Sequence, residues 1–187
     1  MRSRRLGAAF LLLFTLLSRP ATSDPLPAAL QADLVVKVAS YDRNLRARAG
    51  SNVRVVIAAR STDEDARWSS QIRAALGRTE TIAGLPHSEA QVTYTKPGDL
   101  ASTCRNEHAS ILIVSSSLLE ESASIGRAFD GIDILSAAPD SEMARRGVVL
   151  AFELTSGKPK LFLNQSQATK QNVALSAEVM KLMTVYP

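Results

Sequence analysis

Hydrophobic residues follow two different periods in the first half of the chain. A helix is predicted after a lead-in that ends at Pro27 and as far as Ala49, because apolar positions recur there every three or four residues, at Leu30, Leu34, Val38, Tyr41 and Leu45. Residues 53–59 (VRVVIAA) form a short β-branched run, which predicts a buried strand.

A second helix is predicted over residues 63–77, capped by Ser61 or Thr62, with an apolar stripe at Trp68, Ile72, Ala75 and Leu76. That spacing identifies Trp68 as a core residue.

Strand-like and helix-like segments continue to alternate through the middle of the chain. Strands are expected at residues 90–95, 110–114 and 132–137, helices at residues 99–108 and 118–129, and a polar loop at residues 139–146. Strands separated by helices usually belong to βαβ units, in which successive strands run parallel. The middle of the chain therefore predicts a mostly parallel sheet covered by helices.

The end of the chain has a different pattern. Residues 148–154 and 160–163 are two strand-like runs joined by a turn with Gly157, which predicts a β-hairpin. Asn164 is expected to cap a short helix through Lys170. A last helix is expected to be capped by Ser176 and to present one apolar face, made of Val179, Leu182 and Met183. Together the elements predict a single-domain α/β fold, a mostly parallel sheet flanked by helices with a C-terminal β-hairpin and helix.

The first residues have the layout of a secretory signal peptide. Residues 1–5 are basic, residues 6–17 are apolar, and residues 18–23 contain Pro20 and small side chains, which predicts cleavage after Ser23. The apolar run is shorter than the roughly 20 residues that a spanning helix needs. We therefore expect residues 1–23 to be the signal peptide and residues 24–187 to form an exported domain that is not embedded in the membrane.

Signal cleavage changes the charge balance of the chain. The whole sequence has 22 basic and 18 acidic residues, and residues 1–23 contain four arginines and no acid. Subtraction leaves 22 − 4 = 18 basic residues against 18 acidic ones. A surface that binds nucleic acid needs surplus lysine and arginine, so no nucleic-acid partner is expected.

Few residues offer catalytic or metal chemistry. The sequence has no P-loop, GxGxxG, HExxH, GxSxG or CxxC motif, so no catalytic residue, metal or cofactor is predicted and the protein is not expected to be an enzyme. Cys104 is the only cysteine, and burial is the preferred interpretation over a reactive thiol. Cys104 and His108 could share a helix face as half a metal site or an activated thiolate, whereas simple packing is the alternative. His87 is placed in a loop.

Serines mark the predicted carboxyl ends of the central strands. Ser115, Ser116 and Ser117 directly follow the buried strand at residues 110–114, and Ser61 and Ser136 lie near the ends of two others. In open α/β sheets, ligands bind outside the carboxyl ends of the strands. These five serines are therefore the candidate ligand-binding residues, although one of the three consecutive serines could instead cap the following helix.

The C-terminal third resembles a known bacterial family. Residues 147–164 (GVVLAFELTSGKPKLFLN) are similar to the closing hairpin of YfiR-like periplasmic proteins, residues 131–136 (GIDILS) to the strand before it, and residues 173–183 to the final segment. Cys104 precedes a buried strand at a position where members of that family often have cysteine. Because no second cysteine exists, redox control by disulfides is not inferred from the resemblance.

The resemblance implies a function of a particular kind. It implies an exported, non-enzymatic regulatory or sensor protein, located in the periplasm, that binds the periplasmic sensor domain of a membrane signalling protein. In the best-known case that partner is a diguanylate cyclase, which connects the family to cyclic-di-GMP signalling and biofilm formation. The alternative from another class is a periplasmic small-molecule binding protein that assists transport or sensing. A homodimer is included among the expected assemblies.

Overall fold

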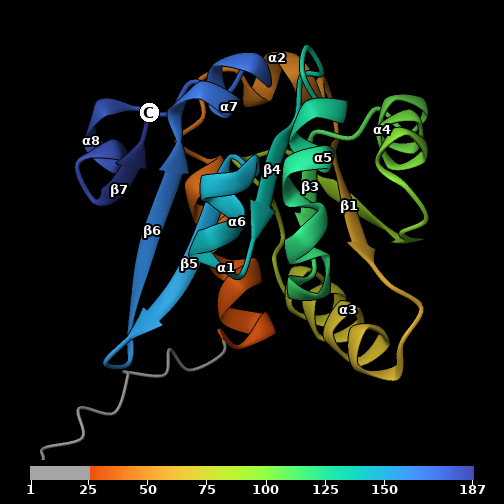
Figure 1. Ribbon diagram of the computed structural model, residues 1–187. Coiled ribbons are helices and arrows are strands. Elements are labelled where there is room, and N and C mark those ends of the chain that lie inside the picture. The colour runs from red at the N-terminus through yellow and green to blue at the C-terminus, as the bar shows by residue number, and fades with distance from the viewer. Residues whose placement is uncertain (1–25) are drawn as a thin grey trace, which may run out of the picture.

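A single seven-stranded sheet forms the centre of the protein in the computed structural model, which describes residues 26–187 (Figure 1). Its order is β2-β1-β3-β4-β5-β6-β7. The strands are β1 (Val53–Ala59), β2 (His87–Thr93), β3 (Ile111–Val114), β4 (Leu135–Ala138), β5 (Leu150–Thr155), β6 (Lys158–Asn164) and β7 (Met183–Tyr186). Every neighbouring pair is parallel except β5 and β6, which form the antiparallel hairpin. The predicted α/β fold class is confirmed.

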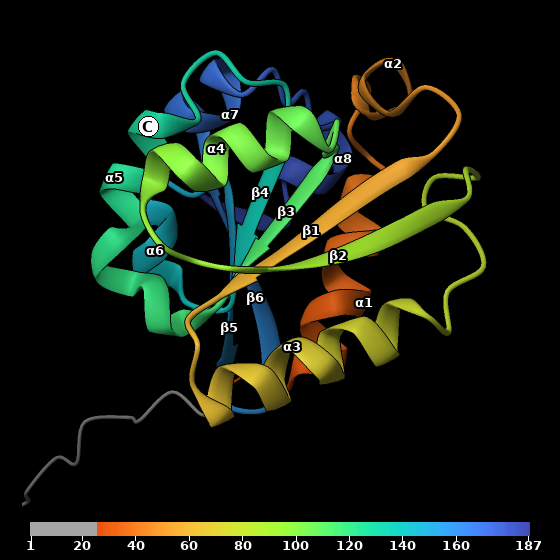
Figure 2. The same ribbon diagram turned by 90° about the vertical axis from the view of Figure 1, so that its right-hand side faces the viewer.

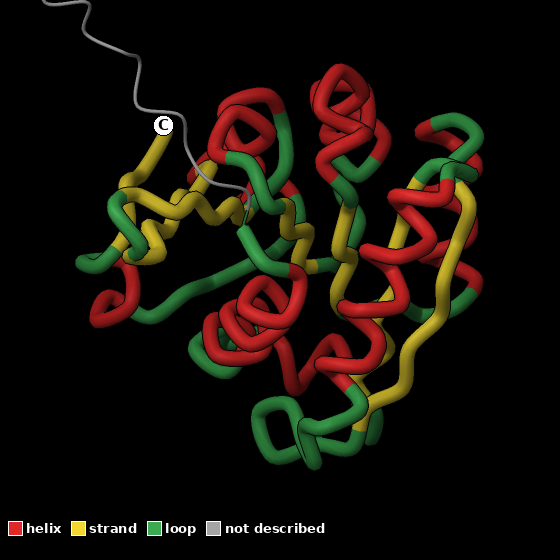
Figure 3. Tube along the Cα trace, turned by 90° about the horizontal axis from the view of Figure 1, so that it is seen from below, coloured by secondary structure: helices red, strands yellow, loops and turns green. Residues whose placement is uncertain are grey.

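Helices cover both faces of this sheet (Figure 2). They are α1 (Ala28–Ala39), α2 (Leu45–Ala49), α3 (Asp63–Leu76), α4 (Pro97–Asn106), the 3₁₀-helix η1 (Ser116–Glu121), α5 (Ser122–Ala128), α6 (Ser141–Arg146), α7 (Gln165–Lys170) and α8 (Ala177–Met180). The tube trace in Figure 3 shows the same arrangement from below. The predicted signal peptide, residues 1–23, lies outside the described residues.

The two layers of helices explain why the central strands are apolar without interruption. Val55 and Ile57 of β1 belong to the cluster that packs against α1 and α3. Val56 and Ala58, which point to the opposite face, belong to the cluster with α4 and α5. Side chains alternate between faces along a strand, so a strand covered on both sides is hydrophobic at nearly every position.

Several predicted local features are present. The hairpin pairs Leu150 with Leu163, and the Asn164 side chain accepts a hydrogen bond of 2.8 Å from the amide of Gln167 at the start of α7. Thr62 caps α3 by accepting from the Asp65 amide at 3.2 Å. Both caps satisfy backbone N–H groups that have no partner inside the first helical turn.

The first predicted helix is wrong in length and only partly right in the face it buries, because Val38 and Leu45 are buried as predicted whereas Leu30 and Leu34 are only partly buried. It divides into α1 and α2, because the Asp42 side chain accepts hydrogen bonds from the amides of Asn44 (3.1 Å) and Ala174 (3.0 Å) and holds residues 40–44 outside a helix. Tyr41 is 39% exposed instead of buried. The buried face consists of Ala28, Gln31, Ala32, Val35, Val38 and Ala39.

Three more predictions need correction. Residues 139–146 are not only a loop, because Asp140 accepts from the Glu142 amide at 2.8 Å and begins α6. The last helix is only four residues long and has no side-chain cap from Ser176. Met183 begins β7 instead, which pairs in parallel with β6. His87 lies in β2, where its strand pairs with β1.

Candidate functional site

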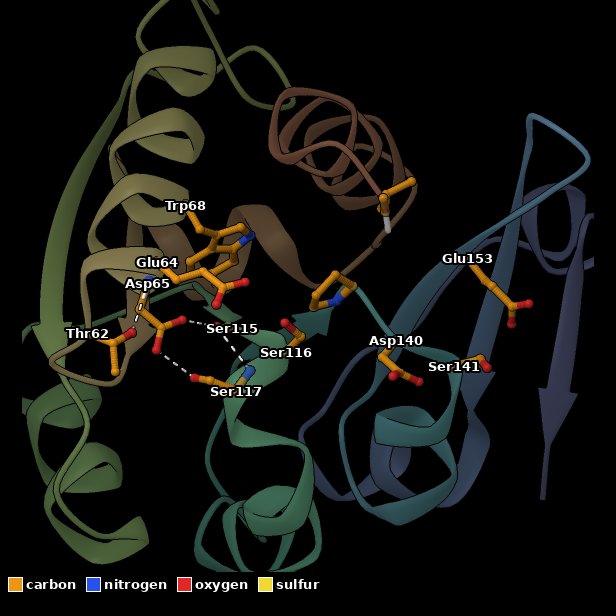
Figure 4. A pocket seen from close by; sticks show the side chains of 12 residues that line it. Thr62, Glu64, Asp65, Trp68, Ser115, Ser116, Ser117, Asp140, Ser141 and Glu153 are labelled. Carbon is orange, nitrogen blue, oxygen red and sulfur yellow. Dashed lines mark hydrogen bonds between the residues drawn. The ribbon is translucent and has the colours of Figure 1, made fainter. Parts of the chain in front are cut away.

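The main pocket lies at the carboxyl ends of β1, β3 and β4 (Figure 4). The chain leaves β1 through α3 to reach β2 on one side, and then returns through α4 to β3 on the other side. Opposite crossover directions leave a crevice between β1 and β3, which is where open α/β sheets bind ligands. The pocket has a volume of about 630 Å³ and is lined by Leu26, Thr62, Glu64, Asp65, Trp68, Ser115, Ser116, Ser117, Pro139, Asp140, Ser141 and Glu153.

Asp65 organises the floor of this pocket. Its side chain is buried and accepts hydrogen bonds from the Arg60 amide (2.9 Å), from the Ser117 hydroxyl (2.7 Å) and from the Ser115 hydroxyl. These three donors come from the end of β1 and the end of β3, and Asp65 itself belongs to the first turn of α3. The carboxylate therefore joins the two central strands and the helix between them.

The three consecutive serines have different roles. The hydroxyls of Ser115 and Ser117 are occupied by Asp65, and the Ser115 oxygen also accepts from the Ser117 amide at 3.2 Å, as an N-cap of η1. Ser116 is exposed, lines the pocket, and makes no side-chain hydrogen bond within the described part of the chain. Of the three hydroxyls, that of Ser116 is the one available to a ligand.

The other two predicted serines lie elsewhere. Ser136 is 1% exposed within the sheet, where its oxygen accepts from the Val149 amide at 3.0 Å. Ser61 lines a neighbouring depression of about 450 Å³ between the ends of β1 and β2. The structure thus brings Ser115, Ser116 and Ser117 together in the main pocket and leaves Ser61 and Ser136 outside it.

Trp68 forms the wall of the pocket on the α3 side. Its indole N–H donates to the Gln31 side chain of α1 at 3.2 Å, and its half-buried ring packs against the larger hydrophobic cluster. Trp68 therefore packs against the core, as its spacing predicted, and also faces the pocket. Asp140 and Glu153 lie on the opposite side, beyond Ser116 (Figure 4).

A polar cluster holds the rim next to the smaller depression. The Arg60 guanidinium lies 3.6 Å from the Glu121 carboxylate and 5.7 Å from the centre of the Tyr94 ring, and it donates to the Ser117 carbonyl at 3.1 Å. The Tyr94 hydroxyl donates to Glu121 at 3.2 Å. Burial, followed by this hydrogen bond, raises the pKa of Tyr94 to about 12, so the phenol stays protonated and the contact persists at neutral pH.

Cys104 and His108 do not form a reactive pair. Cys104 is 1% exposed on the buried face of α4, whereas His108 is exposed and has a φ of 50°. Burial, followed by the Glu107 charge, raises the pKa of the Cys104 thiol to about 12. Among residues 26–187 no group of three or more His, Cys, Asp or Glu side chains could hold a metal ion.

Sequence reasoning missed Asp65 and Glu153 as pocket residues. Asp65 is one of three acids in the first turn of a helix, a position where acids are expected for helix stability alone. Glu153 offered a better signal, because it is a single charged residue in the apolar run of residues 148–154. A charge inside such a run indicates that one position of the strand meets a polar space.

One comparison with known proteins identifies a family, and another identifies solved structures of the same fold. A family model described as YfiR/HmsC-like matches residues 28–184. No curated protein matches the sequence significantly. No helix in the described residues is long and apolar enough to cross a membrane.

Solved structures with the same fold are distant in sequence. They include the ABC domain in complex with L-Trp from Streptococcus pneumonia (11% identity, 85% of this chain, 61% of that chain, TM-score 0.58). A conserved domain protein from Vibrio cholerae has 10% identity over 85% of this chain and 60% of its own, with a TM-score of 0.60. The ligand-free, open CD0873, a substrate binding protein with adhesive properties from Clostridium difficile, has 10% identity over 83% and 58%, with a TM-score of 0.53. This chain spans about three fifths of the length of each.

Proposed function

The chain belongs to the YfiR/HmsC-like family, and on that basis we propose that it is an exported, non-enzymatic regulatory protein of the periplasm that binds a membrane signalling protein. The observation that carries the proposal is the family match over residues 28–184, which covers almost all of the described fold. The pocket is compatible with a binding role, because the hydroxyls of Ser115 and Ser117 are both committed to Asp65 and the Ser116 hydroxyl is left facing the pocket.

The proposed partner is the periplasmic sensor domain of a membrane diguanylate cyclase. A regulator without catalysis acts by binding one conformation of its partner more tightly than the other, which shifts the population of active cyclase. The protein would restrain cyclic-di-GMP synthesis in this way. The extent of repression is set by the difference in affinity between the two conformations.

One corner of the molecule offers an apolar surface for such a partner. Tyr41, Leu182 and Val185 are the large hydrophobic residues of the described chain that are exposed, by 39%, 73% and 42%. The Tyr41 carbonyl accepts from the amide of Ser176, directly before α8, and the other two residues follow α8. We name Tyr41, Leu182 and Val185 the apolar corner. Exposed apolar side chains that share one region are typical of protein-binding sites.

Helix α1 connects the apolar corner with the main pocket. Leu26 lines the pocket just before α1, and Tyr41 lies two residues after the other end of this helix, which runs alongside the sheet (Figure 1). Twelve residues of α-helix are about 18 Å long. A ligand in the pocket and a partner at the corner would therefore contact opposite ends of one rigid element.

Deletion of the gene tests the proposed function. We expect cyclic-di-GMP and biofilm mass to rise in the deletion strain and to return to the starting level when the gene is restored. Restoring the gene without its residues 1–23 is the matched control, because the product would then stay in the cytoplasm. Unchanged cyclic-di-GMP and biofilm in the deletion strain, with the cyclase present, would reject the proposal.

A second candidate function is binding of a small solute, for transport or sensing. The observation that favours it is the position of the main pocket, about 630 Å³ in volume, at the switch point of the sheet. A solute that binds the folded state alone raises the melting temperature as its concentration increases. The test is a thermal-shift screen of periplasmic solutes with Ser116→Phe as the blocked control. The candidate would be rejected if no solute raised the melting temperature, or if every rise were equally large in Ser116→Phe.

A further inference from the structure

The charges that line the main pocket are all of one sign. Glu64, Asp65, Asp140 and Glu153 contribute carboxylates, and none of the lining residues is a lysine or an arginine. No ion pair within 4.0 Å reaches any of these four in the described part of the chain. The pocket therefore has an excess of negative charge that the protein does not balance with a side chain of its own.

Local structure accounts for three of the four carboxylates. Asp65 is saturated by its three donors, and Asp140 accepts from the Glu142 amide as the cap of α6. Glu64 lies in the first turn of α3, where an acid interacts favourably with the helix dipole. These residues would be present in a stable fold even if the pocket never bound a ligand.

Glu153 has no such structural role. It is half-buried in β5 and lines the pocket, and its cross-strand partner in the hairpin is Lys160, with which it forms no ion pair. It caps no helix and accepts no side-chain hydrogen bond in the described residues. Its carboxylate lines the pocket and reaches solvent, so it is available to pair with a cation that enters from outside the protein.

The other residues that line the pocket suit a ligand that has both a positive charge and an apolar part. Trp68 lies across the pocket from Glu153 (Figure 4), and an indole face attracts a cation through its negative quadrupole. Leu26 and Pro139 add apolar surface, and the free hydroxyl of Ser116 can accept a hydrogen bond from an ammonium group. We propose that the main pocket binds a small organic cation, an amine whose ammonium group pairs with Glu153. This inference rests on the second candidate function and names the charge of its solute.

Trp68 provides a direct readout, because it is the only tryptophan of the chain. The purified protein would be titrated with three five-carbon solutes that differ in charge: cadaverine, pentane-1,5-diol and glutarate. Tryptophan fluorescence would be recorded at physiological ionic strength, where weak surface attraction is screened. We expect a saturable change with cadaverine and none with the diol or the dianion.

Two variants place the binding site. Glu153→Gln removes the unpaired charge with little change in size, and we expect it to weaken cadaverine binding about fivefold. Glu178→Gln is the matched control, since Glu178 is exposed on α8 and lines no part of the pocket, and we expect it to bind as the original protein does. Circular dichroism of both variants checks that they fold.

The outcomes separate this inference from the candidate function on which it rests. A response to glutarate or to the diol that Ser116→Phe abolishes would keep solute binding and overturn the proposed charge class. Equal cadaverine affinity in Glu153→Gln and Glu178→Gln would overturn the pairing with Glu153. A silent titration with all three solutes would overturn the inference, while the thermal-shift screen alone decides on solute binding in general.

Discussion

The hydroxyl of Ser117 donates a hydrogen bond of 2.7 Å to the buried carboxylate of Asp65, which joins the end of β3 to the first turn of α3. The same carboxylate accepts from the Ser115 hydroxyl and from the Arg60 amide. The crevice between β1 and β3 therefore has a fixed floor. Ser116, between the two bound serines, is left facing the pocket.

Replacing Asp65 tests this arrangement. Asp65→Ala leaves three donors without their acceptor, and we expect a loss of about 2–4 kcal/mol in the free energy of unfolding. Asp63→Ala is the control, because Asp63 is an exposed acid in the same helical turn. Urea denaturation monitored by circular dichroism measures both. Equal losses for the two variants would mean that Asp65 contributes only through the helix dipole.

The secondary structure could be predicted where packing is uniform along a segment. The strand β1 is surrounded by apolar neighbours on both faces, so its β-branched run was sufficient to locate it. In α1 the apolar spacing was only a partial guide, since the small Ala32 and the polar Gln31 join Val38 on the buried face. The buried Gln31 side chain accepts a hydrogen bond from Trp68, a contact between residues far apart in the sequence that the local pattern does not reveal.

The last strand shows a different limit of sequence reasoning. Met183 follows Val179 at helical spacing, but β7 is only four residues long and forms by pairing with β6, which the local pattern does not reveal. A pocket lies at the strand ends where the sequence predicted a crevice, but most of the residues that line it were not predicted. Strand ends located Ser115, Ser116 and Ser117, whereas the acids across the pocket come from α3, from the turn before α6 and from β5.

Close backbone packing between α5 and the segment after α6 predicts an intolerant position. A Cβ atom on Gly126 would lie 2.7 Å from the carbonyl oxygen of Gly147. We expect Gly126→Ala to lower the free energy of unfolding by about 1–3 kcal/mol, because backbone has to move. Gly98→Ala in α4 meets no atom within 4 Å and should leave stability unchanged or slightly higher. Urea denaturation midpoints compare them, and a loss in both variants would contradict the packing argument.

Burial of Cys104 predicts a slow thiol. With a pKa raised to about 12, the folded protein holds almost no thiolate at pH 8, so a thiol reagent should modify it far more slowly than it modifies the urea-unfolded chain. The reaction of the single thiol is followed by absorbance. Equal rates in the folded and unfolded protein would show that Cys104 is accessible.

The same thiol makes a contribution to the pH dependence of stability. Its pKa is raised on folding, so the contribution is fully present below the unfolded value of 9.0 and is lost as the pH rises toward about 12. We expect Cys104→Ala to have a shallower decline in stability across this window than the original protein. Denaturation midpoints at pH 8 and pH 10.5 measure the difference, and parallel declines would contradict it.

The apolar corner predicts a variant that loses partner binding while keeping the fold. Leu182→Asp places a charge at a side chain that is 73% exposed, so stability should change little while co-purification with the proposed membrane partner should fall at least fivefold. Asn106→Asp is the control, since it adds the same charge at an exposed position at the end of α4. Equal co-purification of both variants would place the partner elsewhere on the molecule.

The proposed repression of a membrane cyclase is tested most directly by adding the purified protein back to cells that lack it. Cells of the deletion strain with a permeabilised outer membrane would receive increasing amounts of the protein while their cyclic-di-GMP is determined. We predict a saturable fall in cyclic-di-GMP with the original protein and a weaker fall with Leu182→Asp. Cyclic-di-GMP that stays constant at every protein concentration, in cells that contain the cyclase, would contradict the proposed function.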